Sequence, residues 1–90
     1  MDTTFRDAHY NIGYINLVYL LDFKAASECF TKAIEIDSLY AESWYNRGLS
    51  YEQLKEYQKA YEDYQKALKL KVNYDKAIEG LNRLDKLLKK

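Results

Sequence analysis

The sequence predicts an all-α fold of antiparallel helix-turn-helix repeats, about five helices in a single domain of 90 residues. Three observations predict this fold. Residues 10–13, Tyr-Asn-Ile-Gly, return 35 residues later as residues 45–48, Tyr-Asn-Arg-Gly, and small and aromatic positions downstream recur at an offset of 34 residues. Apolar residues step by three and four along each segment, as on one face of an amphipathic helix. The chain has no proline, and no segment alternates long enough to predict a strand.

The first repeat spans residues 6–40 and is predicted to hold helices at 6–20 and 23–36. The second of these helices has an inward stripe made of Phe23, Ala26, Phe30, Ala33 and Ile34. This repeat has one more residue between Gly13 and Ala26 than its counterpart has. We expect the extra residue at the end of the first helix or in the turn that follows it.

The second repeat spans residues 41–74, with helices predicted at 41–54 and 57–71. Its second helix has the inward stripe Tyr57, Ala60, Tyr61, Tyr64, Ala67 and Leu68, and charged residues lie largely on the other side. Short polar turns connect all the helices. Connections this short make neighbouring helices antiparallel.

A fifth helix, at 75–88, is predicted to close the stack. Its inward stripe would consist of Ile78, Leu81, Leu84 and Leu88. Gly13 and Gly48 stand in mid-helix, where glycine costs about 1 kcal/mol relative to alanine. Such a cost is tolerable where a bulky residue of a neighbouring helix comes close, and Phe30 and Tyr64 are the large residues at matching positions.

The charge balance gives no support to nucleic-acid binding. The chain has 14 basic and 14 acidic residues; residues 1–40 carry three basic and six acidic ones, and residues 75–90 carry five and three. A nucleic-acid interface needs a clustered basic face. The longest apolar run, residues 17–21, is too short for membrane insertion. No secretory signal is visible, so the sequence leaves the compartment unknown, cytoplasmic or periplasmic.

The residue types that carry catalysis are scattered, so we expect no catalytic residues, no cofactor and no metal site. Cys29 is the only cysteine and lies in an apolar helical pattern, which favours a buried structural thiol. His9 has no companion at metal-ligand spacing, and we expect a half-buried packing residue.

The repeated pattern resembles the tetratricopeptide repeat, a helix-turn-helix unit of 34 residues. The second copy matches its signature at Trp44, Gly48, Tyr51, Tyr57, Ala60, Tyr64 and Ala67. The first copy keeps Gly13, Leu20, Phe23, Ala26, Phe30 and Ala33. It departs at His9, which stands where Trp44 does, and at Asn16, which stands where Tyr51 does. Ser38 and Val72 replace the proline that usually ends the second helix.

The resemblance implies an α-solenoid with a right-handed superhelix that acts as a scaffold for protein–protein interaction and is not an enzyme. The first helix of each repeat would line a concave groove that binds a peptide or a helix of a partner protein. By position, the groove residues would be Tyr10, Asn11, Tyr14, Tyr45, Asn46, Leu49, Gln53 and Lys76. For Asn11 and Asn46, the alternative is an exposed helical asparagine without a role.

One subclass of the family uses a carboxylate clamp to hold the acidic C-terminal tail of heat-shock chaperones. Of its five groove positions, Asn46 and Lys76 match here. Tyr10 replaces the expected lysine, Tyr14 the expected asparagine and Gly80 the expected arginine. Most of the charge-assisted contacts of the clamp are therefore missing, which disfavours this subclass.

The first hairpin has more apolar residues than one hairpin can hide, namely Ile12, Ile15, Val18, Tyr19 and Leu20. Two explanations remain open. In one, the chain is an assembly unit that forms a homodimer through this hairpin. In the other, it is the C-terminal fragment of a longer repeat array, since at least three repeats usually bury a continuous core.

Overall fold

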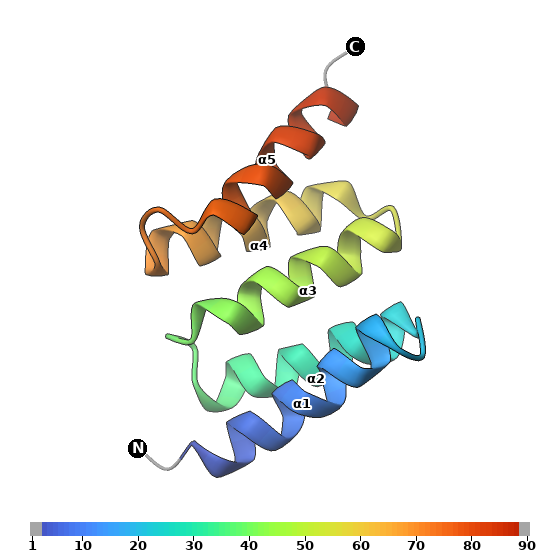
Figure 1. The fold of residues 1–90 in the computed structure, drawn as a ribbon, viewed down its shortest axis with the longest axis vertical. Helices are drawn as coiled ribbons and strands as arrows, with labels where there is room; N and C mark the ends of the chain where they lie inside the picture. Colours follow the sequence, from blue (N-terminus) through green and yellow to red (C-terminus); the bar gives the residue numbers. More distant parts are fainter. Residues whose placement is uncertain (1–2, 89–90) are drawn as a thin grey trace.

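The computed structural model describes residues 3–88 and folds them into five α-helices, with no strand among them. In chain order the helices are α1 (Thr4–Val18), α2 (Phe23–Ile36), α3 (Ala41–Gln53), α4 (Tyr57–Leu70) and α5 (Asp75–Leu88). They stack into an elongated molecule with α1 at one end and α5 at the other (Figure 1). The predicted all-α repeat fold is confirmed.

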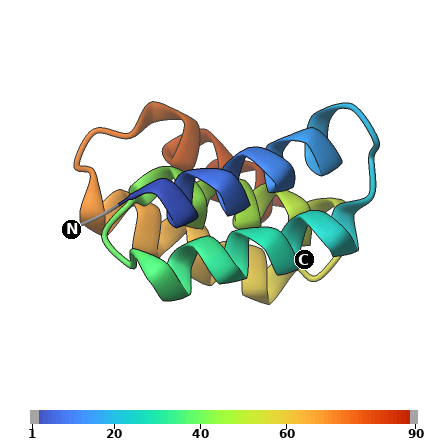
Figure 2. The ribbon, with the colours of Figure 1, turned by 90° about the horizontal axis from the view of Figure 1, so that it is seen from below.

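Each repeat is a helical hairpin. Helix α1 packs along α2, α3 packs along α4, and the two hairpins meet where α2 contacts α3. Helix α5 lies against α4 and closes the stack. Further contacts join α1 to α3 and α3 to α5, so these three helices share one side of the molecule, while α2 and α4 form the other (Figure 2).

The two mid-helix glycines lie where the two helices of each hairpin come close together, as predicted. A β-carbon on Gly13 would stand 2.9 Å from the Phe30 ring, and one on Gly48 would stand 2.8 Å from the Tyr64 ring. Both distances are too short for a real contact, so any other residue would push the helices apart. Phe30 and Tyr64 are fully buried and fill the space between the helices of their repeats.

Helix α1 begins and ends two residues earlier than predicted, at Thr4 and Val18. Its turn to α2 has four residues, 19–22, whereas the turn from α3 to α4 has three, 54–56. The extra residue of the first repeat therefore lies in the turn. The turn reverses the chain through Leu21, whose φ of 54° is left-handed, and Asp22 then caps α2 by accepting a hydrogen bond from the Ala25 N–H.

The inward stripe of α5 agrees with the predicted one at Leu81 and Leu84, which pack in the Tyr64 cluster. It differs at Ile78 and Leu88, which are 37% and 46% exposed, and Ala77 and Gly80 are buried instead. A β-carbon on Gly80 would stand 2.6 Å from the Tyr64 ring, so the helix can approach this ring only with a glycine there.

Candidate functional site

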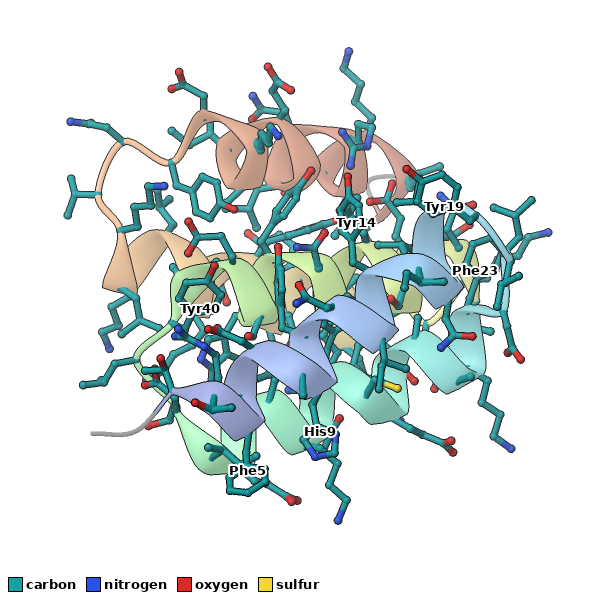
Figure 3. All side chains as sticks on the ribbon, turned by 60° about the horizontal axis from the view of Figure 1, so that its bottom comes forward. Phe5, His9, Tyr14, Tyr19, Phe23 and Tyr40 are labelled. Carbon is teal, nitrogen blue, oxygen red and sulfur yellow. The ribbon has the colours of Figure 1, made fainter. Side chains whose placement is uncertain are left out.

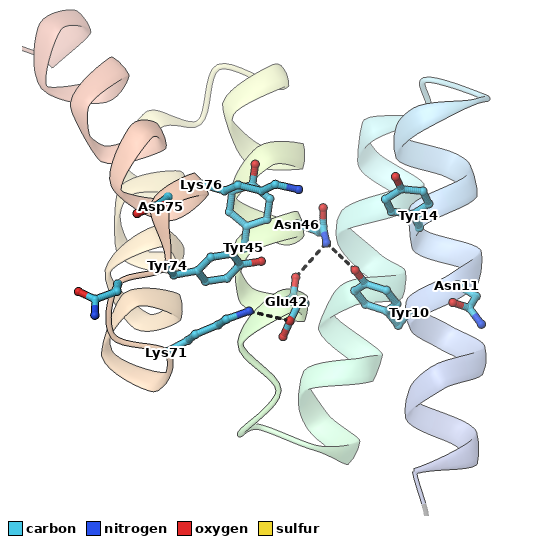
Figure 4. A pocket seen from close by; sticks show the side chains of 11 residues that line it. Tyr10, Asn11, Tyr14, Glu42, Tyr45, Asn46, Lys71, Tyr74, Asp75 and Lys76 are labelled. Carbon is cyan, nitrogen blue, oxygen red and sulfur yellow. Dashed lines mark hydrogen bonds and ion pairs between the residues drawn. The ribbon is translucent and has the colours of Figure 1, made fainter.

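The helices on the α1 side of the stack enclose a cleft of about 710 Å³. Helices α1 and α3 form two of its walls, and the turn from α4 into α5 forms the third (Figure 4). Tyrosine is the most frequent residue type in its lining. The lining residues are Tyr10, Asn11, Tyr14, Glu42, Tyr45, Asn46, Lys71, Asn73, Tyr74, Asp75 and Lys76.

Tyr10 stands between the two repeats. Its ring packs against Phe30, Tyr14 and Tyr40, with centroid separations of 5.6, 6.4 and 5.3 Å. Burial, together with the neighbouring Tyr40 and Glu42, raises the pKa of Tyr10 to about 12. The hydroxyl is therefore neutral at physiological pH and can both donate and accept a hydrogen bond.

Asn46 is buried, with 6% of its surface exposed, and its side-chain amide is already engaged. The Nδ2 atom donates to the Tyr10 hydroxyl at 2.9 Å and to the backbone oxygen of Glu42 at 3.0 Å. The first of these bonds joins α3 to α1. Asn46 thus links the two repeats and orients Tyr10 in the cleft. The sequence had suggested either an asparagine free to contact a partner or an exposed asparagine without a role, and the observed environment differs from both.

Asn11 occupies the same repeat position as Asn46 but has different surroundings. It is exposed, and within residues 3–88 its side chain has no hydrogen-bond partner. Its side chain lies on the far side of α1 from Asn46, at the edge of the cleft (Figure 4). The bond that Asn46 makes needs a preceding first helix, and among the described residues none lies beyond α1.

The charged residues of the cleft differ in how they are held. Lys71 Nζ lies 3.3 Å from Glu42 Oε2 and 4.6 Å from the centre of the Tyr74 ring. Lys76 is exposed, and no ion pair joins it to another residue in the described part of the chain. Its ammonium group is therefore available to an incoming carboxylate.

The other two predicted groove residues lie outside the cleft lining. Leu49 is half-buried and packs against both the Phe30 and the Tyr64 core clusters, so it joins the repeats. Gln53 is the last residue of α3 and is exposed. The other six predicted residues, three tyrosines among them, are brought together around the cleft.

The structure adds five lining residues that the sequence reasoning missed: Glu42, Lys71, Asn73, Tyr74 and Asp75. Four of them come from the turn into α5 and its first residue. Tyr74 follows Tyr40 at the repeat offset of 34, so extending the repeat by one unit would have found it. Its ring packs 5.3 Å from that of Tyr45, and the burial of most of this residue raises the pKa of its hydroxyl, because burial disfavours the charged form.

The remaining candidates have ordinary surroundings. His9 is half-buried, as expected for a packing residue. Cys29 is only half-buried, not buried as expected, and burial raises the pKa of its thiol, which lowers its reactivity. Within residues 3–88, no three side chains of the metal-binding types gather into a site. No helix of the described chain has the length and apolar character needed to cross a membrane.

Comparison with known proteins identifies both repeats. Models of the tetratricopeptide repeat match residues 41–74 and residues 7–38. A curated relative from Dictyostelium discoideum, described as a DnaJ homolog subfamily C member 3 homolog, is 38% identical over 63 residues. That match takes in 70% of this chain but only 12% of the relative.

Two solved structures of the protein MamA superpose on this chain with TM-scores of 0.88 and 0.87, at 29% identity in both cases. Each match covers 94% of this chain, which spans about half of the MamA chains, 49% and 46%. The fold, the two family matches and the repeat spacing agree: the chain belongs to the tetratricopeptide-repeat family.

Proposed function

We propose that this domain is a non-catalytic interaction module whose cleft binds a segment of a partner protein, either extended or helical. The observation that carries the proposal is a cleft of about 710 Å³ that combines several tyrosine rings with one unpaired ammonium group. Members of this family generally bind protein partners. The acidic Glu42 is paired with Lys71 and Tyr10 keeps its proton, so neither is poised for acid–base chemistry.

Each contact residue of the cleft has a distinct role in this binding. Tyr14, 42% exposed, offers its ring to an apolar side chain of the partner. Tyr45 and Tyr74 form the floor and present polar hydroxyls to backbone groups. Lys76 pairs with a carboxylate, which favours a partner segment with an acidic residue. Asn46 acts indirectly, because its amide positions the Tyr10 hydroxyl.

The test is a peptide library displayed on phage and selected against the whole chain, followed by Kd measurements on the selected peptides. We expect acidic residues to be enriched, and we expect Lys76→Glu to weaken binding about tenfold or more, as loss of a charge-assisted contact does. Tyr14→Ala should weaken it as well. Neither side chain is buried, so circular dichroism should show unchanged folding.

Lys24→Glu is the matched control. It makes the same charge reversal on the exposed side of α2, which contributes no residue to the cleft. An acidic residue in the first turn of a helix is also favourable to folding. Selected peptides that bind wild type, Lys76→Glu and Tyr14→Ala equally well would rule out the cleft as the binding site.

A further inference from the structure

One face of α1 is apolar, and no part of residues 3–88 covers it. Along it, five residues follow one another at steps of three and four, and we call them the open stripe: Phe5, Ala8, Ile12, Ile15 and Tyr19. The four large side chains are between 48% and 73% exposed. Figure 3 brings this end of the stack forward, with Phe5 near the start of α1 and Tyr19 near its end.

The second repeat shows that this face is normally covered. Ala8 and Ile15 correspond by the 35-residue offset to Ser43 and Ser50 of α3, which are fully buried. They are buried because the first hairpin, mainly through α2, packs on α3. Among the described residues, no hairpin packs on α1 in the way that the first hairpin packs on α3. The positions that are buried on α3 therefore face solvent on α1.

The open stripe is also chemically unlike its counterpart on α3. Ile12 replaces Arg47, whose guanidinium donates to Thr31 of α2 at 3.1 Å and to Asp63 at 2.8 Å. Ile15 replaces Ser50. The covered face in the second repeat has a polar contact to α2 through Arg47, whereas the open stripe can only offer apolar surface. Its occupant must therefore be apolar as well.

The absence of charge points to a second copy of this chain. No charged residue occurs from Ala8 to Leu21, although 31% of the chain is charged. The two charges at the start of α1 are paired, since Arg6 Nε lies 2.7 Å from Asp7 Oδ1 and Arg6 Nη1 lies 2.8 Å from Asp37 Oδ2. At a two-fold axis each residue meets its own copy, so a charge there would be repelled by an identical charge. The open stripe has no such charge.

The spacing of the open stripe is also nearly symmetric about Ile12: Phe5 and Tyr19 lie seven residues before and after it, Ala8 four before it and Ile15 three after it. In an antiparallel pair of α1 helices, Ile12 would meet Ile12, Phe5 would meet Tyr19, and the small Ala8 would lie within one residue of the larger Ile15. The large side chains would thus contact one another at Ile12 and at both ends, and Ala8 would leave room for Ile15 between them. A two-fold dimer needs this self-complementarity. We propose that the open stripe binds the open stripe of a second copy, antiparallel, with Ile12 at the two-fold axis.

The size of the open stripe sets the expected strength. A helix of 15 residues is about 22 Å long, so the contact falls near or below the roughly 1,200 Å² of total buried area at which stable complexes begin. We therefore expect a reversible dimer with a Kd on the order of micromolar. It is independent of the cleft, since no residue of the open stripe lines it.

Sedimentation velocity across a dilution series of the whole chain tests the proposal. Wild type should pass from dimer to monomer on dilution. Ile12→Arg and Ile15→Ser should be monomeric throughout, and both should fold, because α3 carries arginine and serine at the same positions. Val72→Ser is the control, a similar loss of an exposed apolar side chain, 76% exposed and outside the open stripe; it should dimerise like wild type.

A second experiment tests the two-fold axis. In a Cys29→Ala background, Ile12→Cys should form a disulfide-linked dimer with oxidised glutathione, which takes up the two electrons as two thiols lose their protons. Val72→Cys in that background should not. A wild-type chain that stays monomeric up to roughly 1 mM, a thousandfold above a micromolar Kd, overturns the proposal and leaves the open stripe to a different protein. A dimer that Ile12→Arg leaves intact, or an unlinked Ile12→Cys variant, overturns it too.

Discussion

At the residue scale, the turn between α1 and α2 stores strain at Leu21. Its φ of 54° lies in the left-handed region, which costs an L-residue other than glycine or asparagine about 1–2 kcal/mol. The side chain is 62% exposed, so it gains little by burial in return. The shorter turn from α3 to α4 has a left-handed residue at the same place, Lys55 with a φ of 63°, so the strain belongs to the chain reversal that both turns make and not to the extra residue.

Leu21→Asn should therefore stabilise the domain by about 0.5–1 kcal/mol, since asparagine tolerates the left-handed conformation. Urea unfolding followed by circular dichroism measures the change. Leu20→Asn is the control, because Leu20 is similarly exposed, at 66%, but has no positive φ. An equal effect of both substitutions would show that removing exposed leucine, and not relief of backbone strain, is responsible.

Residue environments at the site were only partly predictable from the sequence. Helical spacing put Tyr10, Tyr14 and Tyr45 on the side of their helices that lines the cleft. It could not distinguish Asn11 from Asn46, since both follow a tyrosine at the same repeat position. The difference comes from α1, which gives Asn46 a tyrosine hydroxyl to bond and gives Asn11 nothing equivalent.

At the scale of elements, close helix contact depends on the glycines. Gly13→Ala should destabilise the domain by about 1–3 kcal/mol, because the added β-carbon would stand 2.9 Å from the Phe30 ring. The gain in helix propensity, about 1 kcal/mol, offsets only part of this. Asn11→Ala on the same helix, which is exposed, should not destabilise it. Unfolding in urea compares the two, and a Gly13→Ala variant as stable as wild type would contradict the packing described.

Element boundaries were predictable where the repeat is regular. The helices at 23–36 and 75–88 have the predicted bounds, and α3 and α4 end one residue early. Only α1 is displaced at both ends, because hydrophobic spacing does not say where an inserted residue goes. The inward face of α5 was predicted correctly at Leu81 and Leu84 and wrongly at Ile78 and Leu88, since periodicity favours large residues inside and the ring of Tyr64 requires a glycine at position 80.

At the scale of the whole molecule, Glu52 joins the second repeat to the closing helix. It accepts a hydrogen bond from the Tyr64 hydroxyl of α4 at 2.7 Å and from Arg83 of α5 at 3.0 Å. Burial alone would raise the pKa of Glu52, but the bonds from Arg83 and Tyr64 outweigh it and hold the pKa below its ordinary value. The three helices are thus tied through one ionised carboxylate.

Acid should loosen this connection. Because the pKa of Glu52 is lowered by folding, its contribution to stability is present above the unfolded pKa of about 4.3 and is lost as pH falls through the folded value. We expect Glu52→Gln to have a lower Tm than wild type at pH 7 and to lose less on acidification. Thermal unfolding between pH 7 and pH 3 measures both. Parallel curves for the two proteins would contradict the assigned role, since all other carboxylates are common to both.

The whole stack was the easiest scale to predict, because a repeated pattern with short turns leaves few ways to arrange the helices. The surfaces through which the molecule contacts other molecules were the hardest to predict. The cleft depends in part on the turn into α5, whose residues the groove prediction did not include. Surplus apolar residues on the first hairpin were expected from the sequence, but the extent of the open stripe comes from comparing the burial of α1 with that of α3.

The ring of Tyr64 is enclosed between Gly48 of α3 and Gly80 of α5, with no room for even a methyl group on either side. A ring held in this way can rotate by half a turn only when the two helices separate for an instant. In a nuclear magnetic resonance spectrum, its two edges should therefore give separate signals that merge on warming. The rate of that exchange would report how often the closing helix separates from the second repeat. The rotation rate of this one buried ring therefore measures how often the stack opens.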